Sequence, residues 1–231
     1  MINANEFRAR ASAAQTLMTA GRNKSEPLGA TVKTYLKKWA QARIYNRKFD
    51  EIEATSVQKG NLMEEQALAF ANFQLAPNEF WEKNEQRFAA ELLEGTPDII
   101  TPSCIVDIKC PVSWATYPLL ENELPEPAYQ LQMQVYMHLT GKRTAYVVYC
   151  LMDTPDELLL KEARSATYRT GELLEAAFDR LKKNLTYSDV PEHLKIKAFR
   201  VDYDPAQIAA LEARVIECRE WLAQFDAIQS V

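Results

Sequence analysis

Two short strings, GTPD at 95–98 and IVDIK at 105–109, constrain what this chain can fold into more than any other feature. The apolar residues of the second string predict a short buried strand, along which side chains alternate between the two faces of a sheet. Asp107 and Lys109 are therefore expected on one face, in contact with solvent, while the isoleucine between them points into the core. Asp98 follows an apolar turn and is expected on the partner strand of a hairpin. Two carboxylates and one ammonium group then converge at one edge of a sheet.

Such a group of side chains suits a hard divalent cation beside a phosphate group. Mg²⁺ prefers oxygen ligands and is usually bound by one or two carboxylates, several waters and substrate phosphates. The backbone carbonyl of Ile108 would add one oxygen to those of Asp98 and Asp107. Lys109 would orient or help to deprotonate an attacking water and offset charge at the phosphorus. The alternative interpretation is a turn-capping aspartate and a solvated strand face, which these strings alone do not exclude.

The length and composition are those of an ordinary globular protein. The 231 residues fit one large domain or a core with helical additions, and 47% hydrophobic and 26% charged residues are typical of soluble proteins. A cytoplasmic protein is expected, because no apolar run spans a bilayer and the first ten residues lack an apolar signal core. Two histidines are too few for a zinc site or a Ser-His triad. Without a CxxC pair, we interpret the cysteines as buried reduced thiols: Cys104, Cys110, Cys150 and Cys218.

The charge is distributed unevenly along the chain. Residues 1–60 carry eleven lysines and arginines against five acidic residues, a net charge of +6, whereas residues 61–231 carry −11 and the whole chain −5. A basic N-terminal face would supply phosphate contacts while the acidic remainder holds a cation, so the distribution favours a nucleic-acid partner despite the negative net charge. A merely solvated helical surface would explain the same counts.

Hydrophobic periodicity predicts an α/β fold with a small mixed central sheet flanked by helices. We expect helices at 4–20, 29–45, about 55–73, 126–140, most of 155–184, and from 204 onward. We expect three short antiparallel strands between 79 and 110, and longer strands at 143–152 and 195–203. The last helix begins with Asp204 as its cap and Pro205 at its first position, and its apolar seam should pack against the core.

Two of the predicted helices carry polar groups that suit a site. Gly60 and Glu64 form a G-x-x-x-E string, in which the carboxylate would be a third acidic group beside a metal, and a helix-surface acid is the alternative. Gln132 and Tyr136 are four residues apart and lie on one helical face, where an amide can donate to phosphate oxygens. A surface glutamine ladder is the alternative there.

Taken in order, these strings resemble a known family. The chain shows G-x-x-x-E, G-T-P-D, I-V-D-I-K-C-P and Q-x-Q-x-Y-M-x-x-T-G, followed by an apolar strand. This series resembles the PD-(D/E)xK nuclease superfamily, and within it the lambda exonuclease and YqaJ-like phage recombination nucleases, over roughly residues 55–150. The resemblance implies a restriction-endonuclease-like core in a single nuclease domain, 1–231. Residues 1–75 would form its helical basic part, and 76–231 its catalytic core and C-terminal helix.

The resemblance also implies roles for individual residues. Asp98 and Asp107 would be metal ligands, Lys109 the catalytic lysine and Glu64 the helix carboxylate, while Gln132 or Gln134 would be the active-site glutamine. Thr96 and Ser12 would bind a terminal 5′-phosphate. Arg8 and Arg10 are candidates for the accompanying arginine, which the family places further upstream. Asp107 stands where the family commonly has Glu, and Glu91 and Glu94 compete for an additional acidic position.

The activity implied by the resemblance is a Mg²⁺-dependent 5′–3′ exonuclease on linear double-stranded DNA, using two ions for which Mn²⁺ can substitute. It would leave 3′ single strands for phage-type homologous recombination, and the absence of a P-loop string argues against ATP use. The implied partners are DNA ends, a single-strand annealing protein and two further copies in a trimeric ring, in the cytoplasm of a bacterium carrying the phage or prophage. The alternatives are a site-specific endonuclease and a non-catalytic DNA-binding protein on the same fold.

Overall fold

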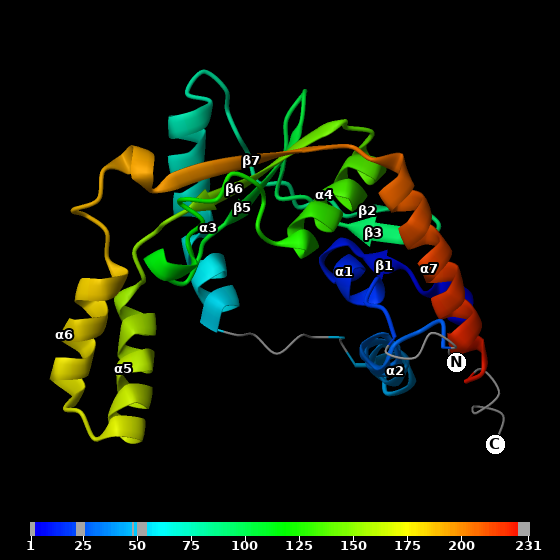
Figure 1. Cartoon of the computed structure of the whole chain (residues 1–231), viewed down its shortest axis with the longest axis horizontal. Coiled ribbons are helices and arrows are strands. Elements are labelled where there is room, and N and C mark those ends of the chain that lie inside the picture. Colours follow the sequence, from blue (N-terminus) through cyan, green and yellow to red (C-terminus); the bar gives the residue numbers. More distant parts are fainter. Residues whose placement is uncertain (1–2, 22–25, 48, 50–54, 226–231) are drawn as a thin grey trace.

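A four-stranded mixed sheet forms the centre of the molecule (Figure 1). The structure, a computed structural model, describes residues 3–21, 26–47, 49 and 55–225. The strands lie in the order β4 (Ile99–Ile100), β5 (Ile105–Lys109), β6 (Thr144–Cys150) and β7 (Ile196–Asp202). β5 and β6 are parallel and the other two pairs are antiparallel, so the predicted small mixed sheet is confirmed.

A second sheet of three very short strands lies beside it. Its order is β1 (Ala9–Arg10), β3 (Leu93–Gly95) and β2 (Phe88–Ala89), with β1 parallel and β2 antiparallel to β3. The interval 79–110 therefore contains four strands divided between two sheets, and the prediction of three antiparallel strands is wrong. The prediction missed this division because strands of two residues carry almost no periodic signal.

The helix expected at 4–20 is also wrong. This segment contains two 3₁₀ turns (Ala4–Glu6 and Ala11–Ala13), strand β1 and the short helix α1 (Ala14–Leu17). Pairing with β3 holds the backbone of β1 extended, so a long-range contact overrides the helical spacing of the apolar residues. The apolar residues themselves are buried as expected, apart from the half-buried Met18: Phe7, Ala11, Ala14 and Leu17.

The remaining helices follow the predicted ranges closely. They are α2 (Ala30–Ile44), α3 (Thr55–Leu75), α4 (Pro127–Thr140), α5 (Asp156–Thr170), α6 (Leu174–Leu185) and α7 (Pro205–Ala223), with 3₁₀ turns at Trp114–Thr116 and Glu192–Leu194. The Asp204 side chain accepts a hydrogen bond of 2.9 Å from the Ala206 N–H, which confirms the cap of α7. Gly141 ends α4 with a positive φ of 73°, a conformation that glycine adopts without strain.

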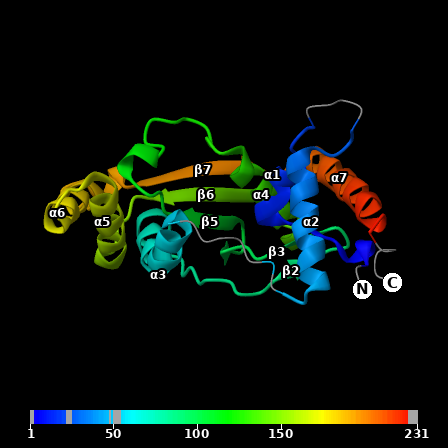
Figure 2. The same ribbon diagram turned by 90° about the horizontal axis from the view of Figure 1, so that it is seen from below.

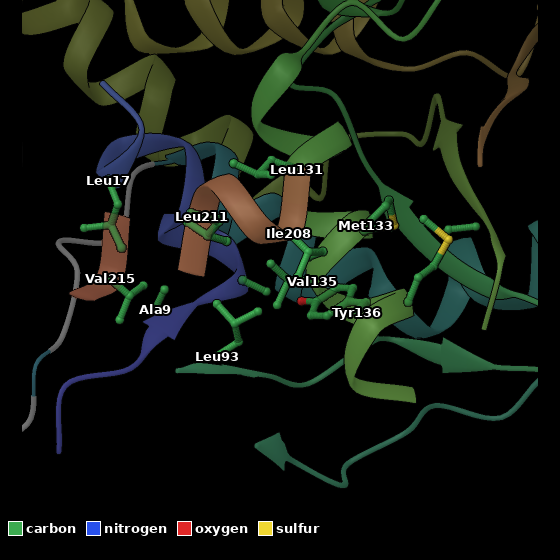
Figure 3. Packing of buried hydrophobic residues seen from close by; sticks show 14 of the residues in the cluster. Ala9, Leu17, Leu93, Leu131, Met133, Val135, Tyr136, Ile208, Leu211 and Val215 are labelled. Atoms are coloured by element: carbon green, nitrogen blue, oxygen red, sulfur yellow. The ribbon is translucent and has the colours of Figure 1, made fainter. Parts of the chain in front are cut away.

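The two faces of the central sheet are covered by different helices. Ala145 and Val147 of β6 belong to the larger core, which α4, α7 and the N-terminal segment complete; Figure 3 shows Ile208, Leu211 and Val215 of α7 in this core. Val148 and Cys150 point to the other face and pack against α3. In Figure 2 α3 lies towards one end of β5 and β6, while α1, α2 and α7 lie towards the other.

Several smaller expectations can be compared with the structure. All four cysteines are free thiols, but Cys104 and Cys110 are only half-buried. In the described ranges, no helix combines the length and the apolar character needed to cross a membrane. Part of the predicted basic N-terminal face lies outside the described residues: Arg22, Lys24 and Lys48, with the acidic Asp50, Glu51 and Glu53.

Candidate active site

Strand β5 places its alternating side chains as the sequence predicts. Ile108 packs with the cluster under α3, while Asp107 and Lys109 point to the opposite side, towards α4. The expectation that Asp107 faces solvent is wrong, because its exposed fraction is 0%. Asp98 immediately precedes β4, and the pairing of Ile99 with Val106 sets the two aspartates side by side.

The two carboxylates and the lysine form a tightly coupled group. The Nζ of Lys109 lies 2.6 Å from Oδ2 of Asp107, and the N–H of Ile108 donates a hydrogen bond of 3.3 Å to Asp98 Oδ2. Apart from the Lys109 ammonium group, no described residue donates a hydrogen bond to either oxygen of Asp107. Buried carboxylates normally accept several hydrogen bonds, so Asp107 keeps oxygen lone pairs that a further ligand can use.

The electrostatics of this group indicate an excess of negative charge. Burial, and then the neighbouring Asp107 carboxylate, raise the pKa of Asp98 to about 7. Burial by itself would lower the pKa of Lys109, but Asp107 and Asp98 more than compensate, so its pKa lies above the ordinary value. The ammonium group therefore stays charged, and one positive charge faces two carboxylates in a space of low dielectric.

The residues present fit a divalent cation of the Mg²⁺ type. Two carboxylates, one of them fully buried, and the adjacent Ile108 carbonyl are hard oxygen ligands. Among the described residues, no three His, Cys, Asp or Glu side chains surround a common point. Glu64 lines the same pocket, but its carboxylate lies 2.5 Å from Lys83 Nζ. The arrangement therefore suits an ion that completes its coordination with waters and substrate phosphate. It suits less well an ion whose ligands all come from the protein.

A pocket of about 570 Å³ opens beside these residues, where β5 and β6 end. Helix α3 contributes Gly60 and Glu64 to its wall, and Asp98 and Lys109 lie at its base. Tyr129 at the start of α4 lies opposite, with its ring centroid 4.6 Å from Lys109 Nζ. A phosphodiester in this pocket would reach Asp98 and Lys109, whereas the buried Asp107 does not line it.

The structure separates the two candidate glutamines. Gln134 is tied to the corner between β7 and α7, because its Nε2 donates to the Asp202 carbonyl (2.9 Å) and its Oε1 accepts from the Asp204 N–H (2.8 Å). Gln132 donates a hydrogen bond of 2.9 Å to the hydroxyl of Tyr136. Burial, and then the charge of Asp107, raise the pKa of this tyrosine, which shows that the Gln132–Tyr136 pair lies near the acidic group.

A second pocket, of about 240 Å³, contains the residues proposed for a terminal phosphate. Arg10, Ser12 and Thr96 all line it, whereas Arg8 is exposed and does not. Two further charged residues complete its wall: Arg87, which the sequence does not single out, and Glu94, one of the two candidates for the additional acid. Neither stands in a recognisable motif, and only the pairing of β2 with β3 brings them to this place.

The two arginines that line this second pocket differ in their ion pairing. Nη2 of Arg87 lies 2.5 Å from Oε1 of Glu94, while Arg10 makes no ion pair within the described part of the chain. Glu91, the other candidate for an additional acid, is exposed and lies 3.9 Å from Arg219. Neither Glu91 nor Glu94 lines the pocket of Asp98 and Lys109.

Tyr136 lines the second pocket and also lies near the acidic group. Its hydroxyl accepts from Gln132 near the aspartates, and its ring packs on Gly95 beside the second pocket; Figure 3 shows it next to Leu93 and Val135. A Cβ added to Gly95 would lie 2.7 Å from Tyr136 Cε1 and 3.0 Å from Ala11 Cβ. Glycine is therefore required for this close approach.

The chain shares its fold, a mixed central sheet flanked by helices, with solved exonuclease structures. The chain is similar to a phage-related exonuclease from Haemophilus somnus 129PT, with 22% identity, 97% of each chain covered and a TM-score of 0.79. It is also similar to the alkaline exonuclease LHK-Exo from Laribacter hongkongensis, with 19% identity, 96% of this chain and 91% of that chain covered and a TM-score of 0.67. No protein-family model and no curated protein matches the sequence.

Proposed function

We propose that this chain is an exodeoxyribonuclease that hydrolyses linear double-stranded DNA from its 5′ ends with Mg²⁺ and without ATP. The observation that carries the proposal is the buried Asp107 carboxylate, paired with Lys109 and next to Asp98, where Asp98 and Lys109 line an open pocket. The fold shared with a phage-related and an alkaline exonuclease supports the same activity.

The residues have distinct tasks in the proposed reaction. Asp98, Asp107 and the Ile108 carbonyl would hold the cation, which when bound stabilises negative charge on the attacking and leaving oxygens, with Mn²⁺ able to substitute. Lys109 remains protonated and acts as a donor and counter-charge to the phosphate oxygens. Gln132 orients the reacting groups through its amide. Water adds to the phosphorus as the bond to the 3′ oxygen breaks, and this oxygen takes up a proton.

Further parts of the proposal rest on the sequence resemblance. They are the recombination role with its 3′ single-stranded product, the trimeric ring, the annealing-protein partner, and the phage or prophage setting in a bacterial cytoplasm. LHK-Exo has also been solved in complex with dAMP, which supports a 5′-mononucleotide as the product class for this chain. Glu64 belongs to the proposed metal site as a residue that would leave Lys83 when an ion binds.

Linear and closed DNA provide the first test. We expect purified protein with Mg²⁺ or Mn²⁺ to degrade linear duplex progressively, to leave covalently closed circular plasmid intact, and to be inactive in EDTA. The reason is a complete hydrolytic group of residues without a base-reading element that the sequence reveals. Gel electrophoresis of both substrates checks this, with a 5′ label reporting the direction. Discrete fragments from the closed circle would support the site-specific endonuclease, and no cleavage at all would support a DNA-binding protein.

The second pocket predicts a preference among DNA ends. A 5′-phosphorylated duplex should be degraded faster than a 5′-hydroxyl duplex, because Ser12, Thr96 and Arg10 offer hydroxyl and guanidinium donors to the phosphate. Ser12→Ala combined with Thr96→Ala should reduce this preference roughly tenfold, since a hydrogen bond to a charged group contributes about 1.5–3 kcal/mol. Initial rates on the two duplexes measure it. Thr19→Ala, an exposed hydroxyl elsewhere, is the control, and equal rates in the unmodified protein would remove the phosphate assignment.

A further inference from the structure

We propose that Glu94 is a specificity-determining residue that limits how tightly the second pocket holds a phosphate, by competing with it for Arg87. This inference rests on the proposed function, in which the pocket takes the terminal 5′-phosphate. Glu94 places a carboxylate where an anionic phosphate is expected to bind. Because like charges repel, a site built only to bind phosphate would not contain it.

The position of Glu94 is fixed by the small sheet. It lies on the central strand β3, directly opposite Arg10 of β1 on one side and Ala89 of β2 on the other. The side chain of Glu94 is only 14% exposed, whereas that of its partner Arg87 is 62% exposed. The sheet therefore anchors the carboxylate, while the arginine lies over it and is free to move towards another anion.

The charges then imply a competition. A guanidinium forms two parallel hydrogen bonds with either a carboxylate or a phosphate, and the Glu94 carboxylate already lies against Arg87. Arg10 also lines the pocket and has no ion-pair partner among the described residues, so a phosphate can bind it without displacing a carboxylate, whereas it reaches Arg87 only by replacing Glu94. The displaced carboxylate stays nearby, because its strand holds it, and repels the bound phosphate. The pocket consequently binds a phosphate more weakly than two arginines alone would.

Moderate binding has a purpose in an enzyme that removes nucleotides one after another. The terminal phosphate leaves with each released mononucleotide, and the same pocket then receives the phosphate of the new 5′ end. A pocket that held the phosphate as tightly as possible would retain the product and slow the next round. Glu94 thus determines the balance between recognition of the end and release of the nucleotide.

Phosphate binding to the whole chain, without DNA, tests this directly. We expect Glu94→Gln to lower the dissociation constants for inorganic phosphate and for dAMP by about tenfold, the effect of freeing one charged hydrogen-bonding group. Glu91→Gln, which makes the same charge change on the exposed surface, should leave both unchanged, and Glu94→Asp should remain close to the unmodified protein. On 5′-phosphorylated duplex, Glu94→Gln should lower KM and kcat together, with stronger inhibition by dAMP. The first cleavage of a 5′-hydroxyl duplex, measured in a single turnover, should keep its rate because no terminal phosphate is present.

An unchanged or raised dissociation constant in a folded Glu94→Gln protein would overturn the inference, because Glu94 would then only support Arg87. Should this variant fail to fold, Arg87→Gln and Glu94→Asp provide the measurement. Arg87→Gln leaves the carboxylate unopposed and should abolish detectable phosphate binding, and retained binding there would also overturn it. A protein that shows these phosphate responses but degrades no DNA would refute the proposed function and leave the competition at Glu94 standing.

Discussion

Changing Asp107 to asparagine should slow the hydrolysis of linear DNA by about a thousandfold or more, because a catalytic metal ion supplies several kcal/mol of transition-state stabilisation. The amide has the shape of the carboxylate but cannot act as a charged ligand. The chain should stay folded, since the substitution removes one of two neighbouring buried carboxylates and leaves Asp98 as a counter-charge to Lys109. Initial rates at saturating Mg²⁺ measure the loss of activity.

Thermal unfolding distinguishes loss of the metal site from general damage. Mg²⁺ should raise the unfolding midpoint of the unmodified protein, because a ligand that binds only the folded state stabilises it, and should have no such effect on Asp107→Asn. Asp179→Asn, on the exposed surface of α6, is the matched control and should keep both activity and the Mg²⁺ response. Near-normal hydrolysis or an unchanged Mg²⁺ response in Asp107→Asn would show that the metal lies elsewhere.

Changing Lys109 to methionine should destabilise the metal-free protein and slow hydrolysis, but should leave Mg²⁺ binding intact. Asp107 would lose the ammonium group that lies against it, and an uncompensated buried charge destabilises a fold by about 3–5 kcal/mol. The metal-free protein should therefore unfold at a clearly lower temperature, and Mg²⁺ should recover much of the loss. Hydrolysis should fall by about a hundredfold or more even with Mg²⁺ bound, because the donor to the phosphate oxygens is missing.

Calorimetry and unfolding together test this second variant. Titration of Mg²⁺ should show that Lys109→Met still binds the ion, while the rate with saturating Mg²⁺ stays low. Lys37→Met, an exposed lysine of α2, should match the unmodified protein in all three measurements. If Mg²⁺ binding disappeared, Lys109 would be a structural residue that keeps the two aspartates in place, and its assignment as a donor to the phosphate would be wrong.

The sequence predicts this site well where local geometry determines it. The alternation along β5 follows from a five-residue apolar strand, and so the shared direction of Asp107 and Lys109 was predictable. The cap of α7 at Asp204 was predictable for the same reason, because the capping bond spans two residues. The burial of Asp107 was not predictable, because it depends on how closely α4 packs against β5.

Other features depended on contacts that no local pattern contains. Gln132 and Gln134 could not be separated because α4 is buried on all sides from Leu131 to Met137, so helical spacing no longer indicates which side faces the site. Arg87 and Glu94 come together only through the pairing of two very short strands. The false helix at 4–20 has the same origin, since only β3 makes Ala9–Arg10 extended.

The short segment from Thr96 to Asp98 has a consequence for the length of DNA removed in each cycle. Thr96 lines the pocket proposed for the terminal phosphate, and Asp98 lies at the acidic pair proposed to cut. Two residues of extended chain span at most about 7 Å. The position that binds the terminal phosphate and the position of cleavage are therefore separated by a fixed and very short distance. Under the proposed function, this fixed distance means that each cleavage releases a single nucleotide, whatever its base.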